Sequence, residues 1–126
     1  MIGIIITHGH LAEELLKTAA TIVGELHDCF ALSGAELCDD EVVERITGIL
    51  KSGGDGEAFL FVDYFGGSCC TSCVRASRPF ENVKVISGVN LPMILDFVTK
   101  QDTMGMDDLA DHLIHRGRES VRTIDL

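Results

Sequence analysis

The chain has 126 residues, of which 46% are hydrophobic and 24% are charged. A chain of this length and composition can bury one hydrophobic core, so we expect a single folded domain over residues 1–126 and no disordered region. Acidic residues outnumber basic residues 20 to 10, giving a net charge of −10. This excess argues against binding to nucleic acids or anionic membranes, because both need clustered Lys and Arg.

The N-terminal half predicts two strand–helix pairs. Residues 2–6 are apolar and rich in β-branched side chains, which is typical of a strand buried on both faces. Apolar residues then recur at helical spacing over residues 11–23. A weaker strand candidate covers residues 28–33, with residues 29–32 as its apolar centre, and Asp39 or Asp40 can cap the helix that follows.

The middle of the chain repeats the pattern. Residues 58–62 predict a second strand buried on both faces, and Gly66-Gly67-Ser68 opens a helix that stops before Pro79. Residues 83–86 predict the fourth strand.

Two more helices complete the predicted order. One starts around Asn90 and Pro92, and the next covers residues 106–116. Residues 120–124 can form a last strand or extend that helix. The alternation of strands and helices predicts an α/β fold with an open, mainly parallel, four-stranded sheet and helices on both faces. We expect the strand order 2-1-3-4.

Two polar residues follow the most apolar strands. His8 comes after the first strand and Asp63 after the third. In the order 2-1-3-4 these strands are neighbours, so the two side chains would face each other where ligands bind in such sheets. A carboxylate that accepts the Nδ1 proton would leave His8 Nε2 bare, as a nucleophile, a base or a metal ligand. His8 can alternatively cap the helix that follows it.

A glycine-rich turn supplies a third feature. Gly66, Gly67 and Ser68 lie at a strand-to-helix turn, where successive N–H groups can bind an anion of phosphoryl size. Taken alone, such a turn is also a common start of a helix. His10 lies two residues beyond His8 and can point into the same crevice or cover the helix.

The chain has five cysteines: Cys29, Cys38, Cys69, Cys70 and Cys73. The odd number and the lack of an export signal argue against a disulfide framework and favour a cytoplasmic protein. We expect thiols packed under a helix. A metal-binding module using His8, His10 and the cysteine cluster is an alternative, but only one CxxC pair is present, so we assign no metal ligands.

Three segments together resemble a known family. They are Thr7-His8-Gly9, Val62-Asp63-x-x-Gly66-Gly67-Ser68 and Gly88-Val89-Asn90-Leu91-Pro92-Met93. They occur in the order seen in the mannose/fructose-family enzyme IIA domain of the bacterial phosphoenolpyruvate-dependent sugar phosphotransferase system (PTS). The similarity extends to Gly117-Arg118-Glu119.

The resemblance implies a phosphotransferase component without a metal or organic cofactor. His8 matches the histidine that accepts a phosphoryl group from the phosphocarrier HPr and passes it to a IIB partner. Asp63 matches the carboxylate that orients the ring, and the turn at Gly67 and Ser68 matches the site for the phosphoryl oxygens. The family is a homodimer in which a C-terminal strand, here residues 120–124, crosses to the other subunit. Contact with the membrane is expected only through transporter partners.

Two related functions remain open at this stage. One is a regulatory phospho-acceptor that transports no sugar, because its acceptor domain would have the same sequence. The other is the phosphotransfer subunit of dihydroxyacetone kinase, where we expect Ser-His-Ser in place of Thr7-His8-Gly9.

The chain departs from the family pattern after the glycine-rich turn. Cys69 stands where the family usually has proline. A thiol at a helix N-terminus can have a lowered pKa. We therefore consider that Cys69 is sensitive to oxidation and that its oxidation blocks phosphorylation.

Overall fold

The computed structural model describes residues 1–34 and 37–125, which form four strands and five helices. In chain order they are β1 (Ile2–Thr7), α1 (Leu11–Val23), β2 (Cys29–Ser33), α2 (Asp39–Ser52), β3 (Ala58–Val62), α3 (Ser68–Ser77), β4 (Val83–Ser87), α4 (Leu91–Lys100) and α5 (Met106–Glu119).

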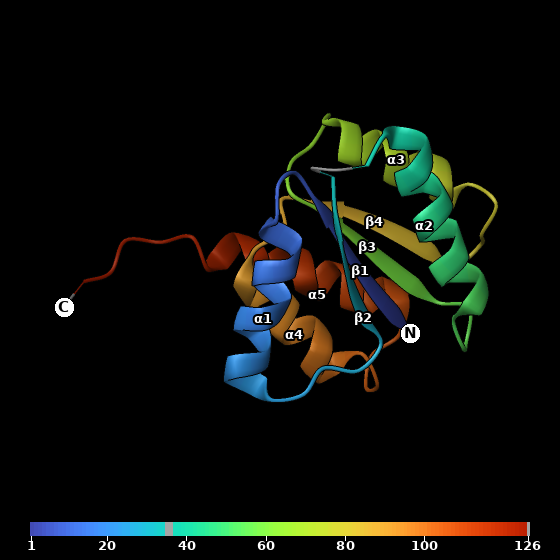
Figure 1. Ribbon diagram of the computed structural model, residues 1–126. Helices are drawn as coiled ribbons and strands as arrows, with labels where there is room; N and C mark the ends of the chain where they lie inside the picture. The colour runs from blue at the N-terminus through green and yellow to red at the C-terminus, as the bar shows by residue number, and fades with distance from the viewer. Residues whose placement is uncertain (35–36, 126) are drawn as a thin grey trace.

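The four strands form one parallel sheet in the order β2-β1-β3-β4, as expected (Figure 1). From β1 the chain first adds β2 on one side and then returns to add β3 on the other side. The strand order therefore reverses between β1 and β3. Loops beyond the carboxyl ends of two such strands diverge and leave a crevice between them.

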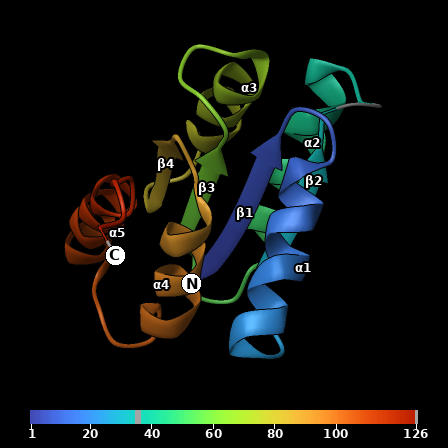
Figure 2. The same cartoon turned by 90° about the vertical axis from the view of Figure 1, so that its left-hand side faces the viewer.

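Helices cover both faces of the sheet. Helices α2 and α3 lie on one face, and α1, α4 and α5 lie on the other, as the two views show (Figures 1 and 2). Successive side chains of the central strands point to opposite faces of the sheet, so the hydrophobic core is divided into two clusters, one on each face. In β1, for example, Ile4 and Ile6 pack toward α2 and α3, whereas Ile5 packs toward α1 and α4.

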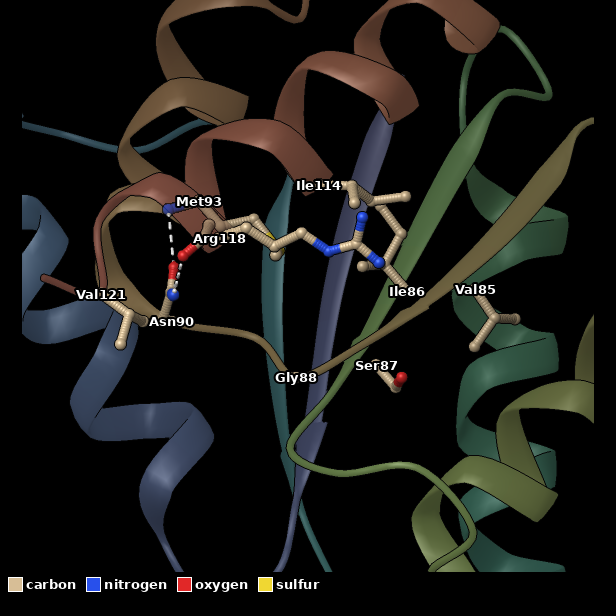
Figure 3. A pocket seen from close by; sticks show the side chains of 10 residues that line it. Val85, Ile86, Ser87, Gly88, Asn90, Met93, Ile114, Arg118 and Val121 are labelled. Atoms are coloured by element: carbon tan, nitrogen blue, oxygen red, sulfur yellow. Dashed lines mark hydrogen bonds between the residues drawn. The ribbon is translucent and has the colours of Figure 1, made fainter.

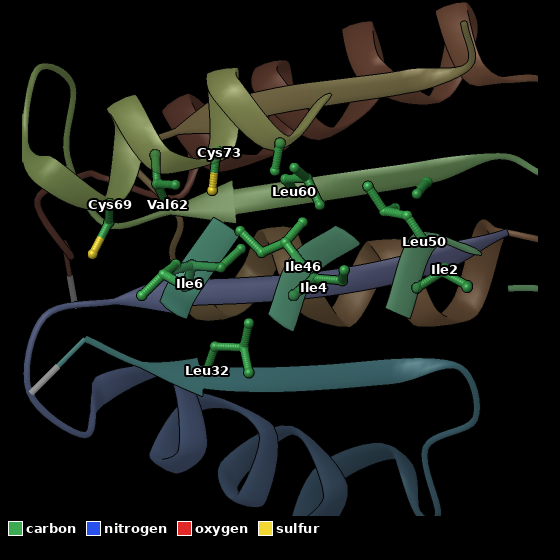
Figure 4. Close-up of a cluster of buried hydrophobic side chains, with 13 residues drawn as sticks. Ile2, Ile4, Ile6, Leu32, Ile46, Leu50, Leu60, Val62, Cys69 and Cys73 are labelled. Carbon is green, nitrogen blue, oxygen red and sulfur yellow. The ribbon is translucent and has the colours of Figure 1, made fainter. Parts of the chain in front are cut away.

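The core under α2 and α3 includes two of the cysteines. Cys69 and Cys73 lie one helical turn apart on α3, and both thiols are directed from the helix toward the sheet (Figure 4). Both residues are buried, which confirms the expectation of thiols packed under a helix. Cys69 is the one at the end of the sheet where the strands finish (Figure 4).

Two details of the expected elements need correction. Cys38, not an aspartate, occupies the N-cap of α2, and Asp39 and Asp40 lie in the first helical turn, where their charges favour the helix dipole. Helix α5 runs on to Glu119, beyond the expected end at Arg116. Residues 121–125 are neither helix nor strand in the isolated chain and extend away from the body (Figure 1). In the described part of the chain, no helix is long and apolar enough to cross a membrane.

Candidate active site

The candidate site at the carboxyl ends of β1 and β3 is built by the backbone that follows each strand. Gly9 has a φ of 53° and Gly66 has a φ of 87°, a conformation that a Cβ atom disfavours and that glycine adopts readily. Gly9 turns the chain from β1 into α1, and Gly66 turns the loop after β3 toward α3. The residues next to these glycines, which the sequence marks as candidates, are thereby held over the end of the sheet.

His8 and Asp63 form a hydrogen-bonded pair at the ends of these two strands. Asp63 Oδ2 lies 2.8 Å from His8 Nδ1 and also accepts the backbone N–H of His8 at 2.9 Å. Since Oδ2 already accepts one hydrogen bond as a carboxylate, the proton between the two side chains belongs on Nδ1. His8 Nε2 is then left with a free lone pair. The structure brings these two predicted residues together as expected.

The environment of Asp63 keeps this carboxylate ionised. Its side chain is only 15% exposed, and burial by itself raises the pKa. The backbone N–H of His8, the ring of His8 and the backbone N–H of Tyr64 together outweigh burial, and the net effect lowers the pKa. An ionised Asp63 can therefore balance a positive charge on the ring.

The glycine-rich turn lies on the other side of the imidazole. Helix α3 begins at Ser68 with Gly67 as its N-cap, so its first N–H groups point out of the helix end. Ser68 Oγ lies 3.4 Å from His8 Nε2. The free ring nitrogen therefore faces a hydroxyl group and the N-terminus of a helix, a position that favours an anion.

Thr7 and Tyr64 hold the imidazole in place, and sequence reasoning gave neither of them a role. Thr7 is fully buried, and its Oγ1 accepts the N–H of Ala12 at 2.7 Å. The side chain that accepts a hydrogen bond from the first turn of α1 is therefore that of Thr7 and not that of His8. The ring of Tyr64 stacks on that of His8 with centroids 5.2 Å apart. Both residues adjoin a predicted site residue in sequence, and Thr7 is also part of the family-like segment Thr7-His8-Gly9.

The expectation of a lowered pKa at Cys69 is wrong. Burial raises the pKa of Cys69, and the negative charges of Asp63 and Asp39 raise it further. These effects outweigh the help that a helix N-terminus gives to a thiolate. The sulfur nevertheless lies 3.8 Å from His8 Nδ1, so Cys69 borders the site.

His10 and the third family-like segment lie apart from these contacts. His10 is largely exposed, with Nδ1 3.5 Å from a carboxylate oxygen of Glu13 on α1. In the third segment, Asn90 caps α4 by accepting the N–H of Met93 and donates to the carbonyl of Gly117 at the end of α5 (Figure 3). Its role in this structure is to join two helices.

A hollow of about 460 Å³ lies beside this helix junction, not at His8. It opens along the edge strand β4 and is lined by residues that include Ile86, Ser87, Ile114, Arg118 and Val121 (Figure 3). The edge of β4 has no neighbouring strand among the described residues.

Comparison with known proteins identifies the same family as the sequence motifs. The family model described as PTS system fructose IIA component matches residues 3–114. The mannose-specific EIIAB component of the PTS of Escherichia coli (strain K12) is 32% identical over 121 residues, which cover 94% of this chain. The chain spans only 38% of the length of that relative.

Two relatives are closer to this chain in length. The sorbose-specific EIIA component of the Klebsiella pneumoniae PTS is 29% identical over 112 residues, covering 88% of this chain and 82% of that protein. The solved mannose/sorbose-specific IIA subunit from Enterococcus faecalis superposes with a TM-score of 0.90 at 32% identity, covering 99% and 95% of the two chains. With the family match extending over residues 3–114, the chain belongs to the family of PTS system fructose IIA components.

Proposed function

We propose that this chain is a phosphotransferase component of a sugar PTS. It takes a phosphoryl group from phosphorylated HPr onto His8 and passes it to a IIB partner. The observation that carries this proposal is the geometry of His8, whose Nδ1 faces Asp63 while Nε2 faces Ser68 at the N-terminus of α3. We also propose that residues 1–126 act as a single IIA domain.

The chemistry is an in-line displacement at phosphorus. The Nε2 lone pair of His8 forms the new N–P bond as the bond to the donor histidine breaks, and charge develops on the three equatorial oxygens. Backbone N–H groups around Gly67 and Ser68, with the Ser68 hydroxyl, would stabilise those oxygens. Asp63 balances the positive charge that forms on the ring.

The exposure of the site suits transfer between proteins. The His8 side chain is 45% exposed, so a histidine on another protein can approach Nε2 directly. Tyr64 stacks on the His8 ring and is 55% exposed, and Phe65, which follows it in the sequence, is 84% exposed. Exposed aromatic side chains around a reactive group are typical of a docking rim, which here would contact HPr and IIB in turn.

We propose that the protein is a homodimer joined through its C-terminal tail. The tail carries two exposed apolar residues, Val121 and Ile124, and the outer edge of β4 lies beside a hollow lined by both apolar and polar side chains. A tail strand from a second copy would pair with β4 and cover both surfaces.

The decisive experiment is transfer of phosphate from phosphoenolpyruvate through enzyme I and HPr. We expect the mass to increase by one phosphate, as an acid-labile and base-stable adduct at His8. His8→Ala should abolish it. Asp63→Asn should slow it by about two orders of magnitude or more, because the ring loses its oriented tautomer. An adduct that survives His8→Ala contradicts the proposal.

A further inference from the structure

Three potential metal ligands of different chemistry converge at the phosphoryl-acceptor site. Among the described residues, His8, Asp63 and Cys69 each offer one ligand atom, and all three atoms lie within 4.8 Å of one another. They come from the end of β1, the end of β3 and the first turn of α3. The group is not the one the sequence suggested, because His10, Cys70 and Cys73 do not belong to it.

The separations of these atoms suit a tetrahedral ion. Zn²⁺ bonds of about 2.0–2.3 Å separate neighbouring ligand atoms by roughly 3.3–3.7 Å. Here His8 Nδ1 lies 2.8 Å from Asp63 Oδ2 and 3.8 Å from Cys69 Sγ. To reach this geometry, His8 Nδ1 and Asp63 Oδ2 would have to move apart by roughly 0.5–0.9 Å, and Cys69 Sγ would have to move closer to Nδ1 by roughly 0.1–0.5 Å.

The chemistry of the three ligands also selects the ion. An imidazole nitrogen, a carboxylate and a thiolate are ligands that Zn²⁺ accepts together, whereas Mg²⁺ and Ca²⁺ prefer oxygen ligands alone. The carboxylate and thiolate charges neutralise a divalent cation. Because His8 is 45% exposed, water can occupy the fourth position.

We propose that His8 Nδ1, Asp63 Oδ2 and Cys69 Sγ bind Zn²⁺ or a similar borderline divalent ion, and that the bound ion prevents His8 from accepting a phosphoryl group. The second half of this statement rests on the proposed function. Binding releases the thiol proton of Cys69 to solvent. The ring stays neutral, and its proton moves from Nδ1, now bound to metal, to Nε2. The nitrogen that attacks phosphorus then has no lone pair, so metal and phosphoryl transfer exclude each other.

The first experiment uses Co²⁺ alone as a spectroscopic probe of the whole chain. We expect a thiolate-to-Co²⁺ charge-transfer band in the near ultraviolet that Zn²⁺ displaces. Cys69→Ser and Cys69→Ala should remove the band and weaken Zn²⁺ affinity by at least about tenfold. Cys38→Ser, at an exposed thiol on the N-cap of α2, is the matched control and should keep the band. Circular dichroism checks that each variant is folded.

A band of equal strength in the folded Cys69 variants, or no band in the wild-type protein, would overturn the metal site. Neither result depends on whether the chain accepts a phosphoryl group.

The second experiment measures phosphoryl transfer from purified phosphorylated HPr with EDTA and with Zn²⁺. For each variant the ratio of the two rates is compared, so effects of Zn²⁺ on the donor cancel. We expect Zn²⁺ to suppress transfer at least about tenfold in the wild-type and Cys38→Ser proteins, and far less in Cys69→Ser. Equal suppression in Cys69→Ser rejects the inference. No transfer to any protein in EDTA instead rejects the proposed function, and leaves the Co²⁺ result to decide the metal site.

Discussion

At the residue scale, the site depends on how closely neighbouring groups confine one imidazole. Asp63 holds one nitrogen, Ser68 lies near the other, and Tyr64 stacks on the ring face. Gly67 closes the remaining side. A Cβ at this position would lie 3.1 Å from His8 Cε1 and 2.8 Å from Tyr64 Cζ. Any residue can adopt the φ of −80° found at Gly67, so the backbone conformation does not require glycine here. What requires glycine is the lack of space for a Cβ atom.

Gly67→Ala should slow phosphorylation of His8 by about tenfold to a hundredfold, because displacement of a reacting group by up to about 1 Å has effects of this size. The effect is measured by comparing initial rates of phosphoryl transfer from phosphorylated HPr to the variant and to the wild-type protein. Gly48→Ala, at an open helical position, is the control and should leave the rate unchanged. A Gly67→Ala rate equal to that of the wild-type protein would show that the ring is not confined at this side.

The lowered pKa of Asp63 predicts how stability changes with pH. The unfolded chain binds a proton at this carboxyl at a higher pH than the folded chain does. Its contribution to the free energy of unfolding is therefore complete above the ordinary value of 3.8 and is lost as the pH falls through the lower, folded value.

Urea unfolding of the wild-type protein and Asp63→Asn, at about pH 7 and about pH 3, tests this. The stability advantage of the wild-type protein should be larger at neutral pH. An advantage that grows on acidification would mean that the pKa of Asp63 is raised in the folded state.

At the element scale, helix α4 docks onto β1 through a glycine. Phe97 is buried and packs edge-on against Phe59 and Phe61, with ring centroids 5.7 and 5.3 Å away. It lies over Gly3, where a Cβ would come within 2.5 Å of the Phe97 ring. The break in the isoleucine run of β1 thus provides the space that this helix fills.

Gly3→Ala should destabilise the fold by about 1–3 kcal/mol through overpacking. Gly48→Ala should stabilise it by about 0.5–1 kcal/mol, because Gly48 is an exposed residue inside α2 with no atom near its missing Cβ. Chemical denaturation of both variants measures the two changes, and a stable Gly3→Ala variant would contradict the close packing of α4 on β1.

At the scale of the whole molecule, the proposed dimer rests on two features, the outer edge of β4 and the C-terminal tail. The outer edge of β4 has no neighbouring strand among the described residues. Residues 121–125 extend away from the rest of the chain (Figure 1). If two copies exchanged their tails, the tail of each copy would pair with the β4 edge of the other, and the two contacts would be related by symmetry.

A chain shortened after Ser120 should therefore lose the dimer, as should Ile124→Asp. Sedimentation or light scattering would report the mass. Ile22→Asp places the same charge at another exposed isoleucine, on α1, and should leave the mass unchanged. A wild-type protein that is monomeric, or a truncated protein that still dimerises, would contradict exchange of the tails.

Local patterns in the sequence were sufficient to predict the elements and their order. Apolar β-branched runs marked the strands, helical spacing marked the helices, and the parallel order 2-1-3-4 was confirmed. The expected end of α5 was three residues short, because polar residues in its last turn carry no apolar signal. The capping of α2 was predicted wrongly, because Asp39 and Asp40 suit the first turn as well as the cap.

The sequence by itself determined which residues end the central strands, and therefore which side chains reach the crevice. Only the tertiary structure decided the contacts between them. His8 and Asp63 are 55 positions apart, and their hydrogen bond depends on the register of β1 against β3. The stacking of Tyr64, which follows β3, depends on the same register, and the burial of Cys69 beside the imidazole depends on where α3 packs. No local pattern encodes the approach of segments so distant in the chain.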